Sequence, residues 1–411
     1  MAGPLGHVRV LDLSRVLAGP WAGQNLADLG AEVIKVERPK VGDDSRAFGP
    51  PWVKDKAGNP TRDSAYFTSA NRGKKSITLN IARPEGQALV RELARHCDVL
   101  IENYKHGDLA RYGLGYEDLK ALNPRLVYCS VTGFGQTGPY RERPGYDFMI
   151  QGMGGMMSVT GEPDGAPGGG PQRAGVPIAD IVTGMYASIA ICAALASRDA
   201  QGPNRGQGQH LDLALLDSQI ALLAYQNTNY FSTGKPPARI GNLHPNIVPY
   251  QPFKASDGEV IVACGNDNLF RKFCEAAGRP ELADDPRFAS NGKRVENRAE
   301  MTRVIQEFFG RRTKAEWLER LEAAGVPNGP INDLAQVFEE PQVKARGVKI
   351  ELEHAAAGTL PLVASPMHFS GTPLEYRLAP PLLGQHTEEI LRGLLGKSAA
   401  EIARLRADGV L

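Results

Sequence analysis

The chain of 411 residues carries 47 Lys and Arg against 46 Asp and Glu, and its net charge of +1 argues against a broad nucleic-acid-binding surface. With 42% hydrophobic and 23% charged residues, it has the composition of a globular protein of two or three domains. Five widely spaced cysteines form no C-x-x-C pair, and neither a signal peptide nor an apolar stretch of membrane-spanning length is evident, so we expect a cytoplasmic protein with reduced thiols and no membrane partner.

The N-terminal part alternates predicted strands and helices. Residues 7–13 read as a buried strand, Ala18-Gly19-Pro20 opens a helix that ends at Gly30, and residues 31–37 form a second strand. A strand–helix–strand unit of about 30 residues is typical of a parallel α/β sheet. The same alternation continues with strands over 76–80, 98–102 and 126–132 and a helix over 84–96.

Polar and basic residues follow several of these predicted strands. In open parallel sheets, ligands bind where the strands end, so the loops after them should gather at one rim. Basic residues occur at or near these positions: Arg15, Arg38, Arg72, Lys74, Lys75 and Arg111. They are either solvated surface charges or a cationic rim for a polyphosphate ligand. Tyr104, next to Asn103, is either a platform for a nucleobase or a core aromatic.

The rest of the chain predicts a second domain. Residues 178–197 form a long apolar helix of small side chains, residues 198–209 begin a linker, and a further helix lies within 211–231. Short β-like runs and amphipathic helices follow, which indicates a smaller α+β domain. We therefore expect the following division: a large domain over 1–200, a linker over 201–245, the small domain over 246–330, and a return linker with the end of the large domain over 331–411.

One carboxylate stands out in the middle of the chain. Asp180 lies at the start of the long apolar helix, behind the glycine-rich tract 161–171. Aspartate is a preferred helix cap, so Asp180 is either an N-cap or a shielded nucleophile or base. The string GFGQTG over 133–138 fits G-x-G-x-x-G, but Pro139 and a polar stretch follow it instead of a helix, which argues against a dinucleotide site. No metal-ligand or P-loop motif occurs, and we expect no bound metal.

Several long strings resemble the class III CoA-transferase family (CaiB/BaiF type), which includes formyl-CoA transferase. They are LDLSRVLAGPWAGQNLADLGAEVIKVERPKVGDDSR (residues 11–46), NRGKKSITLN, YCSVTGFGQTGPY, RPGYD, VPIADIVTGMYA, IVPYQPF, GVPNGPIN and PLLGQHT, which together span nearly the whole chain. The resemblance implies an α/β fold: a Rossmann-like large domain with a parallel sheet, and a smaller α+β domain. It also implies an interlocked-ring homodimer.

The resemblance assigns roles to individual residues. It makes Asp180 the nucleophile, which forms an anhydride with the acyl group and then a thioester with CoA. The expected CoA contacts are Val16, Ala18, Arg38, Lys75, Asn103, Tyr104 and Arg111, with Arg72 added from the basic rim. Leu17 stands where formyl-CoA transferases have glutamine, which puts oxalate as a substrate in doubt. Gly265 and Asn266 are candidate oxyanion donors, and Tyr146 is a candidate substrate contact.

Activity and substrate are also implied by the resemblance. Four strings (RVLAGP, GDDSR, YCSVTGFGQTGPY and IVPYQPF) most resemble the succinyl-CoA:glutarate branch, so we expect acyl-CoA and a small dicarboxylic acid as substrates and no tightly bound cofactor. Arg46 and Arg72 are candidates for binding a distal carboxylate. Two alternatives remain. One is an α-methylacyl-CoA racemase, although Tyr146-Asp147 stands where racemases have a His-Asp pair. The other is a CoA-binding protein without activity.

Overall fold

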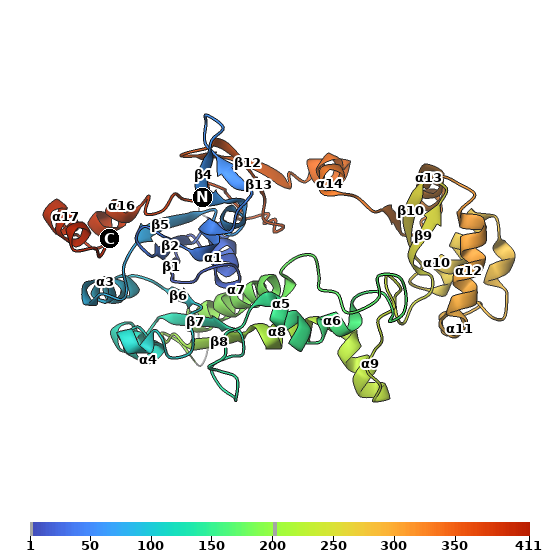
Figure 1. Ribbon diagram of the computed structural model, residues 1–411, viewed down its shortest axis with the longest axis horizontal. Helices are drawn as coiled ribbons and strands as arrows, with labels where there is room; N and C mark the ends of the chain where they lie inside the picture. Colours follow the sequence, from blue (N-terminus) through green and yellow to red (C-terminus); the bar gives the residue numbers. More distant parts are fainter. Residues whose placement is uncertain (1–2, 200–203) are drawn as a thin grey trace. The chain divides into compact units, whose positions relative to one another are not determined.

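The computed structural model describes residues 3–199 and 204–411 and divides the chain into two compact units. The first unit comprises residues 1–156, 174–231 and 344–411, and the second comprises 157–173 and 232–343. The second unit therefore includes the glycine-rich tract 161–171, which the sequence analysis had placed in the large domain. The first unit has two hydrophobic cores and the second unit has one, and Figure 1 shows the elements of both units.

A six-stranded parallel sheet forms the centre of the first unit. Its strands lie in the order β5-β2-β1-β6-β7-β8. Their bounds are β1 Arg9–Asp12, β2 Glu32–Glu37, β5 Lys74–Thr78, β6 Val99–Glu102, β7 Val127–Thr132 and β8 His210–Ala214. Strands β1, β2 and β5 follow one another toward one edge of the sheet, and strands β6, β7 and β8 follow one another toward the other edge. The loops after the neighbouring strands β1 and β6 diverge, which opens a crevice at the carboxyl edge of a doubly wound sheet. The predicted parallel α/β fold is confirmed.

Helices cover both faces of this sheet, so its strands are apolar on both sides (Figure 1). Along β1, Val10 belongs to one core and Leu11 to the other. One face packs against α3 (Pro84–Ala94), α4 (Tyr116–Leu122), α16 (Thr387–Gly393) and α17 (Ala399–Ala407). The other packs against α1 (Ala18–Asp28), α5 (Asp147–Met153), α7 (Ile178–Asp199) and α8 (Leu215–Leu222).

Helix α7 places Asp180 next to the start of α1. A Cβ on Gly184 would lie 2.6 Å from the Ala18 carbonyl oxygen, so only glycine permits this approach of the two helices. By length and composition α7 is apolar enough to cross a membrane, which the sequence analysis did not expect. In this helix Ala179, Ala187 and Ile191 are fully buried in a core of the first unit.

Strand β8 corrects the expected linker over 201–245. Residues 210–214 pair with β7 as the sixth strand of the sheet, and α8 follows directly, so the linker prediction is wrong for residues 210–222. Leucines at 211 and 213 alternate with His210 and Asp212, the pattern of a half-buried edge strand, which was read as helix. Residues 200–203, at the start of the expected linker, lie outside the described residues.

The second unit is a small α+β fold. An antiparallel sheet in the order β11-β10-β9 packs against helices around buried Phe273, Phe309 and Trp317. Its main elements are β9 Tyr250–Ala255, β10 Gly258–Ala263, α10 Asp267–Ala277, η3 Pro280–Ala283, α11 Asn291–Glu296, α12 Arg298–Phe309, α13 Lys314–Ala323, β11 Asn328–Pro330 and α14 Leu334–Glu339. The remaining elements of the chain are η1 Asp44–Ala47, β3 Trp52–Lys54, β4 Pro60–Ser64, α2 Ala65–Thr68, η2 Ala110–Tyr112, α6 Met156–Val159, α9 Tyr225–Thr233, α15 Pro341–Ala345, β12 Lys349–His354 and β13 Gly358–Val363.

Candidate active site

A cleft of about 290 Å³ opens at the carboxyl edge of the sheet, and we call it the Asp180 cleft. The loops after β1, β6 and β7 line it together with Asp180 of α7. Its charged and aromatic lining residues are Arg15, Asp44, Tyr104, Lys105, His106, Asp108, Arg141, Arg143, Tyr146 and Asp180. The strand order reverses between β1 and β6, so the cleft lies where a doubly wound sheet binds its ligands.

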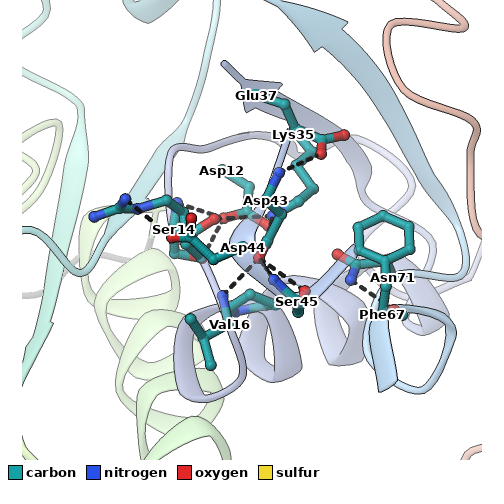
Figure 2. Close-up of polar contacts among 12 residues, drawn as sticks. Asp12, Ser14, Val16, Lys35, Glu37, Asp43, Asp44, Ser45, Phe67 and Asn71 are labelled. Carbon is teal, nitrogen blue, oxygen red and sulfur yellow. Dashed lines mark hydrogen bonds and ion pairs between the residues drawn. The ribbon is translucent and has the colours of Figure 1, made fainter. Parts of the chain in front are cut away.

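The loop after β1 is held in an unusual conformation. Val16 has φ of 70°, in the left-handed region that a β-branched residue rarely adopts. Its N–H donates to Asp43 Oδ1 at 3.0 Å, and the same oxygen accepts from the backbone N–H of Ser45 at 2.9 Å (Figure 2). Buried Lys35 lies 2.8 Å from Asp43 Oδ2 and donates to the Ser14 carbonyl, also at 2.8 Å. The strained loop is therefore fixed by a buried ion pair.

A second buried ion pair supports the same loop. The Lys74 ammonium donates to Asp12 Oδ2 at 2.9 Å and to the Pro20 carbonyl in α1 at 2.8 Å, and both charged side chains are fully buried. Asp12 Oδ1 accepts from the backbone N–H of Ser14 at 2.9 Å. Burial lowers the pKa of Lys74 to about 8, although the Asp12 charge acts in the opposite direction. These contacts join β1, the loop after it and the first turn of α1.

Asn103 joins the loop after β6 to the loop after β1. Its Oδ1 accepts from the Arg15 N–H at 2.9 Å, and its Nδ2 donates to the Arg15 carbonyl at 2.7 Å. The Arg15 guanidinium lies over the Tyr104 ring, 4.8 Å from its centroid, and bonds to Asp44 at 3.2 Å. Tyr104 is half-buried and packs against the core, and it also lines the cleft, so its role as a platform for a nucleobase stays a prediction.

Asp180 is inside α7 and does not cap it. Asp147 takes that role: its Oδ1 accepts from the N–H groups of Ala179 at 2.8 Å and Asp180 at 3.2 Å. Asp147 Oδ2 in turn accepts from Gln151 Nε2 at 2.6 Å. Within the part of the chain that the structure describes, no group donates a hydrogen bond to the Asp180 carboxylate. Burial, and secondly the charge of Asp147, raise the pKa of Asp180 to about 7.

Seven predicted site residues line one cleft. They are Val16, Leu17, Ala18, Asn103, Tyr104, Tyr146 and Asp180. Two predicted cations lie close by: Arg38 bonds to Asp44, and Arg111 bonds to Asp108, and both aspartates line the cleft.

Other predicted residues are engaged elsewhere. Buried Arg46 bonds to Glu37 and Asp63, buried Arg72 bonds to Asp28, and Lys75 bonds to Glu32 and Glu389. None of these three cations lines the Asp180 cleft. Gly265 and Asn266 belong to the second unit, where the Asn266 side chain caps α10 by accepting from the Leu269 N–H at 2.9 Å.

The sequence did not mark four cleft residues: Lys105, His106, Arg141 and Arg143. The two arginines in the string YRERPGYD, which leads into α5, were the available signal for Arg141 and Arg143. No sequence signal marked Tyr66 in α2 either, which lies outside the cleft lining. Burial and, to a smaller extent, the charges of Asp180 and Asp147 raise the pKa of Tyr66 to about 12. Across residues 3–199 and 204–411, no group of three or more His, Cys, Asp or Glu side chains is placed to hold a metal ion.

Comparisons with known proteins cover almost the full chain. The model of CoA-transferase family III matches residues 5–387. Succinate–glutarate CoA-transferase of Agrobacterium fabrum is 50% identical over 391 residues, which are 95% of this chain and 96% of that protein. Succinyl-CoA:glutarate CoA-transferase of Homo sapiens is 43% identical over 408 residues, 99% and 90% of the two chains. A solved CAIB/BAIF family protein from Brucella suis superposes with a TM-score of 0.82 at 49% identity, covering 96% of this chain and 100% of its own.

Proposed function

Because the chain belongs to CoA-transferase family III and is a CoA-transferase, we propose that it moves CoA from succinyl-CoA to a second dicarboxylate through covalent intermediates on Asp180. The observation that carries this proposal is the Asp180 carboxylate, which accepts no hydrogen bond among the described residues and lines a cleft at the switch point of the sheet. The full-length relatives named as succinate–glutarate transferases support dicarboxylates as the acids exchanged.

The proposed chemistry exchanges acyl groups between carboxylates and a thiolate. Asp180 attacks the thioester carbonyl, the C–S bond breaks, and CoA leaves as a thiolate. The acyl group is then joined to Asp180 in a mixed anhydride. The thiolate attacks the aspartyl carbonyl and releases the donor acid, which leaves an aspartyl-CoA thioester. The acceptor carboxylate attacks that thioester to form a second anhydride. The thiolate then takes the new acyl group and Asp180 returns as a carboxylate. No net electron or proton transfer is required.

The cleft loops supply the proposed CoA site. Val16, Ala18, Asn103 and Tyr104 come from the loops after β1 and β6, where the buried ion pairs fix the backbone. In the described part of the chain, Arg38 and Arg111 each bond to an exposed or half-buried aspartate, so a phosphate can compete for them at small cost. Lys75 and Arg72 are bonded outside the cleft and are not part of this proposal. Gly265 and Asn266 remain predicted oxyanion donors.

The activity should depend on the ionisation of Asp180. Only its carboxylate is nucleophilic, so kcat/KM for the acyl-CoA donor should rise with pH through about 7, the raised pKa of this group. In Asp147→Asn one negative charge is removed beside Asp180, so its pKa falls and the rise moves to lower pH. Burial is the larger cause and persists, which makes the shift partial. Asp44→Asn, at another cleft carboxylate, should leave the pH of the rise unchanged. An unmoved rise in Asp147→Asn would contradict this role.

A panel assay tests the function directly. Purified protein is given succinyl-CoA with acceptors of four to six carbons, and new acyl-CoA esters are quantified by chromatography. Transfer to glutarate or another C4–C6 dicarboxylate is expected. If no such acid accepts CoA, the proposed substrate class is wrong. A 2-methylacyl-CoA in the same panel tests the racemase alternative, and its epimerisation would favour that reading.

We also propose that the enzyme is a cytoplasmic homodimer. Large apolar side chains are exposed on α5, α7 and α9, among them Phe148 (59% exposed), Ile189 (61%) and Phe231 (76%). Single exposed apolar residues are common in monomers, but large exposed apolar side chains on three helices of the first unit suit an interface. A monomer in sedimentation velocity at micromolar concentration would contradict the proposal.

A further inference from the structure

The cations that line the Asp180 cleft fall into two groups, those bonded to a carboxylate and those with no such partner among the described residues. Arg15 bonds to Asp44 and Arg141 bonds to Glu142, each at 3.2 Å. Arg143 and Lys105 also line the cleft, and no acceptor for either side chain is found among the residues described, 3–199 and 204–411. A guanidinium has five N–H donors in one plane, so Arg143 offers more unused hydrogen bonds to a ligand than Lys105 does.

Two aromatic rings hold the Arg143 side chain in place. Its guanidinium carbon lies 4.5 Å from the centroid of the Tyr140 ring and 5.4 Å from that of Phe134. The two rings contact each other edge to face, with their centroids 5.5 Å apart. The backbone N–H of Arg143 donates to the backbone carbonyl of Tyr140 at 2.8 Å. Attraction between a guanidinium and an aromatic ring does not use the N–H groups of the guanidinium as hydrogen-bond donors to oxygen, so these remain available to a ligand. Arg143 is therefore positioned for a planar, two-oxygen partner with little further loss of side-chain entropy.

The position of Arg143 in the chain relates it to the reacting group. It lies in the segment between β7 and α5, and the backbone between it and Asp147 spans at most about 14 Å. Asp147 accepts a hydrogen bond from the Asp180 N–H, so this segment borders the nucleophile. The expected CoA contacts Val16, Asn103 and Tyr104 come instead from the loops after β1 and β6. Both CoA, through its phosphates, and the dicarboxylic acid are anions that Arg143 could bind. Of these two, the acid is the one whose reacting carboxylate must lie at Asp180.

We propose that Arg143 binds the distal carboxylate of the dicarboxylate through paired N–H···O bonds while the reacting carboxylate lies at Asp180. This rests on the proposed function and replaces Arg46 and Arg72, whose guanidiniums are bonded to buried carboxylates away from the cleft. Arg143 thereby selects dicarboxylates over monocarboxylates, since an acceptor without the second carboxylate leaves the guanidinium unpaired.

The test compares glutarate with monomethyl glutarate, which has nearly the same shape but no distal charge. In a ping-pong scheme kcat/KM for the acceptor reports only the step after the aspartyl-CoA thioester forms. Arg143→Gln should lower kcat/KM for glutarate roughly 10- to 100-fold and change that for the ester less than about twofold. Arg143→Lys should fall between, because an ammonium keeps the charge but not the planar fork. Lys105→Gln, at the other unpaired cation, is the matched control and should retain the preference for glutarate.

Three results would overturn the proposal. One is an equal loss for both acceptors. Another is a rise in KM for the acyl-CoA donor with unchanged acceptor preference, which would assign Arg143 to a CoA phosphate. The third is loss of the glutarate preference in Lys105→Gln alone. The side chain of Arg143 is exposed, so the variants should fold, and unchanged thermal unfolding confirms it. Failure of the proposed function is distinguishable, because the parent enzyme would then transfer CoA to no dicarboxylate.

Discussion

Asp180→Asn is expected to abolish CoA exchange, with kcat reduced about 10⁴-fold or more, because an amide cannot form the anhydride or the thioester. Asparagine keeps the size of the side chain, so the cleft remains open to both substrates. In the parent enzyme, hydroxylamine added with succinyl-CoA should convert the acylated aspartate to a hydroxamate on the peptide that contains Asp180. Peptide mass spectrometry should find this product in the parent and not in Asp180→Asn.

The same variant should fold at least as well as the parent. The Asp180 carboxylate accepts no hydrogen bond from any described residue, and its raised pKa shows that burial and Asp147 disfavour its charge. Replacing it by a neutral group removes this unfavourable charge at pH 8, so the midpoint of thermal unfolding should stay equal or rise. Catalysis would then be lost without loss of structure. Substantial transfer by Asp180→Asn, or hydroxamate on another peptide only, would show that the nucleophile is a different residue.

Much of the fold could be predicted from periodicity and turn residues. The segments expected as strands over 7–13, 31–37, 76–80, 98–102 and 126–132 are β1, β2, β5, β6 and β7. Most of them are short apolar runs between polar loops, since both faces of the sheet are covered, whereas β5 begins with two ion-paired lysines. β8 was missed because an edge strand with alternating polar residues, followed at once by a helix, has no breaker to separate the two. Its partner β7 is about 80 residues away in the chain, and no local pattern shows that contact.

The site shows the same division between local and long-range information. The sequence shows Asp180 at the start of an apolar helix, and from that position alone an N-cap was a reasonable interpretation. The structure gives the capping contact to Asp147, 33 residues earlier, which frees the carboxylate of Asp180. From the sequence, Arg46 and Arg72 were expected to be available to bind a carboxylate of the substrate. In the structure they bond to the buried carboxylates Glu37 and Asp28, and the sequence does not show this pairing. Which charges pair internally is decided by packing, and spacing in the sequence does not reveal it.

Asp43→Ala should destabilise the first unit by about 3–5 kcal/mol, because it leaves the Lys35 ammonium buried without its counterion. Burial alone would raise the pKa of Asp43, but the Lys35 charge and the N–H groups of Ser45 and Val16 hold it at about 2, so the carboxylate is charged throughout the neutral range. Its loss also removes the hydrogen bond that holds Val16 at φ of 70°. The midpoint of thermal unfolding should fall on the order of 10 °C.

The neighbouring Asp44 provides the control, since its side chain is 40% exposed and its ion pairs among the described residues are with Arg15 and Arg38. Exposed ion pairs contribute about 0–1 kcal/mol, so Asp44→Ala should unfold within a few degrees of the parent. Adding Lys35→Met to Asp43→Ala removes the unpaired charge and should recover part of the lost stability, which a double-mutant cycle measures as a coupling energy. If the double variant is no more stable than Asp43→Ala alone, the unpaired ammonium is not the cause. Asp43 would then act mainly through its hydrogen bonds to Val16 and Ser45, and the strain of the loop would account for the loss.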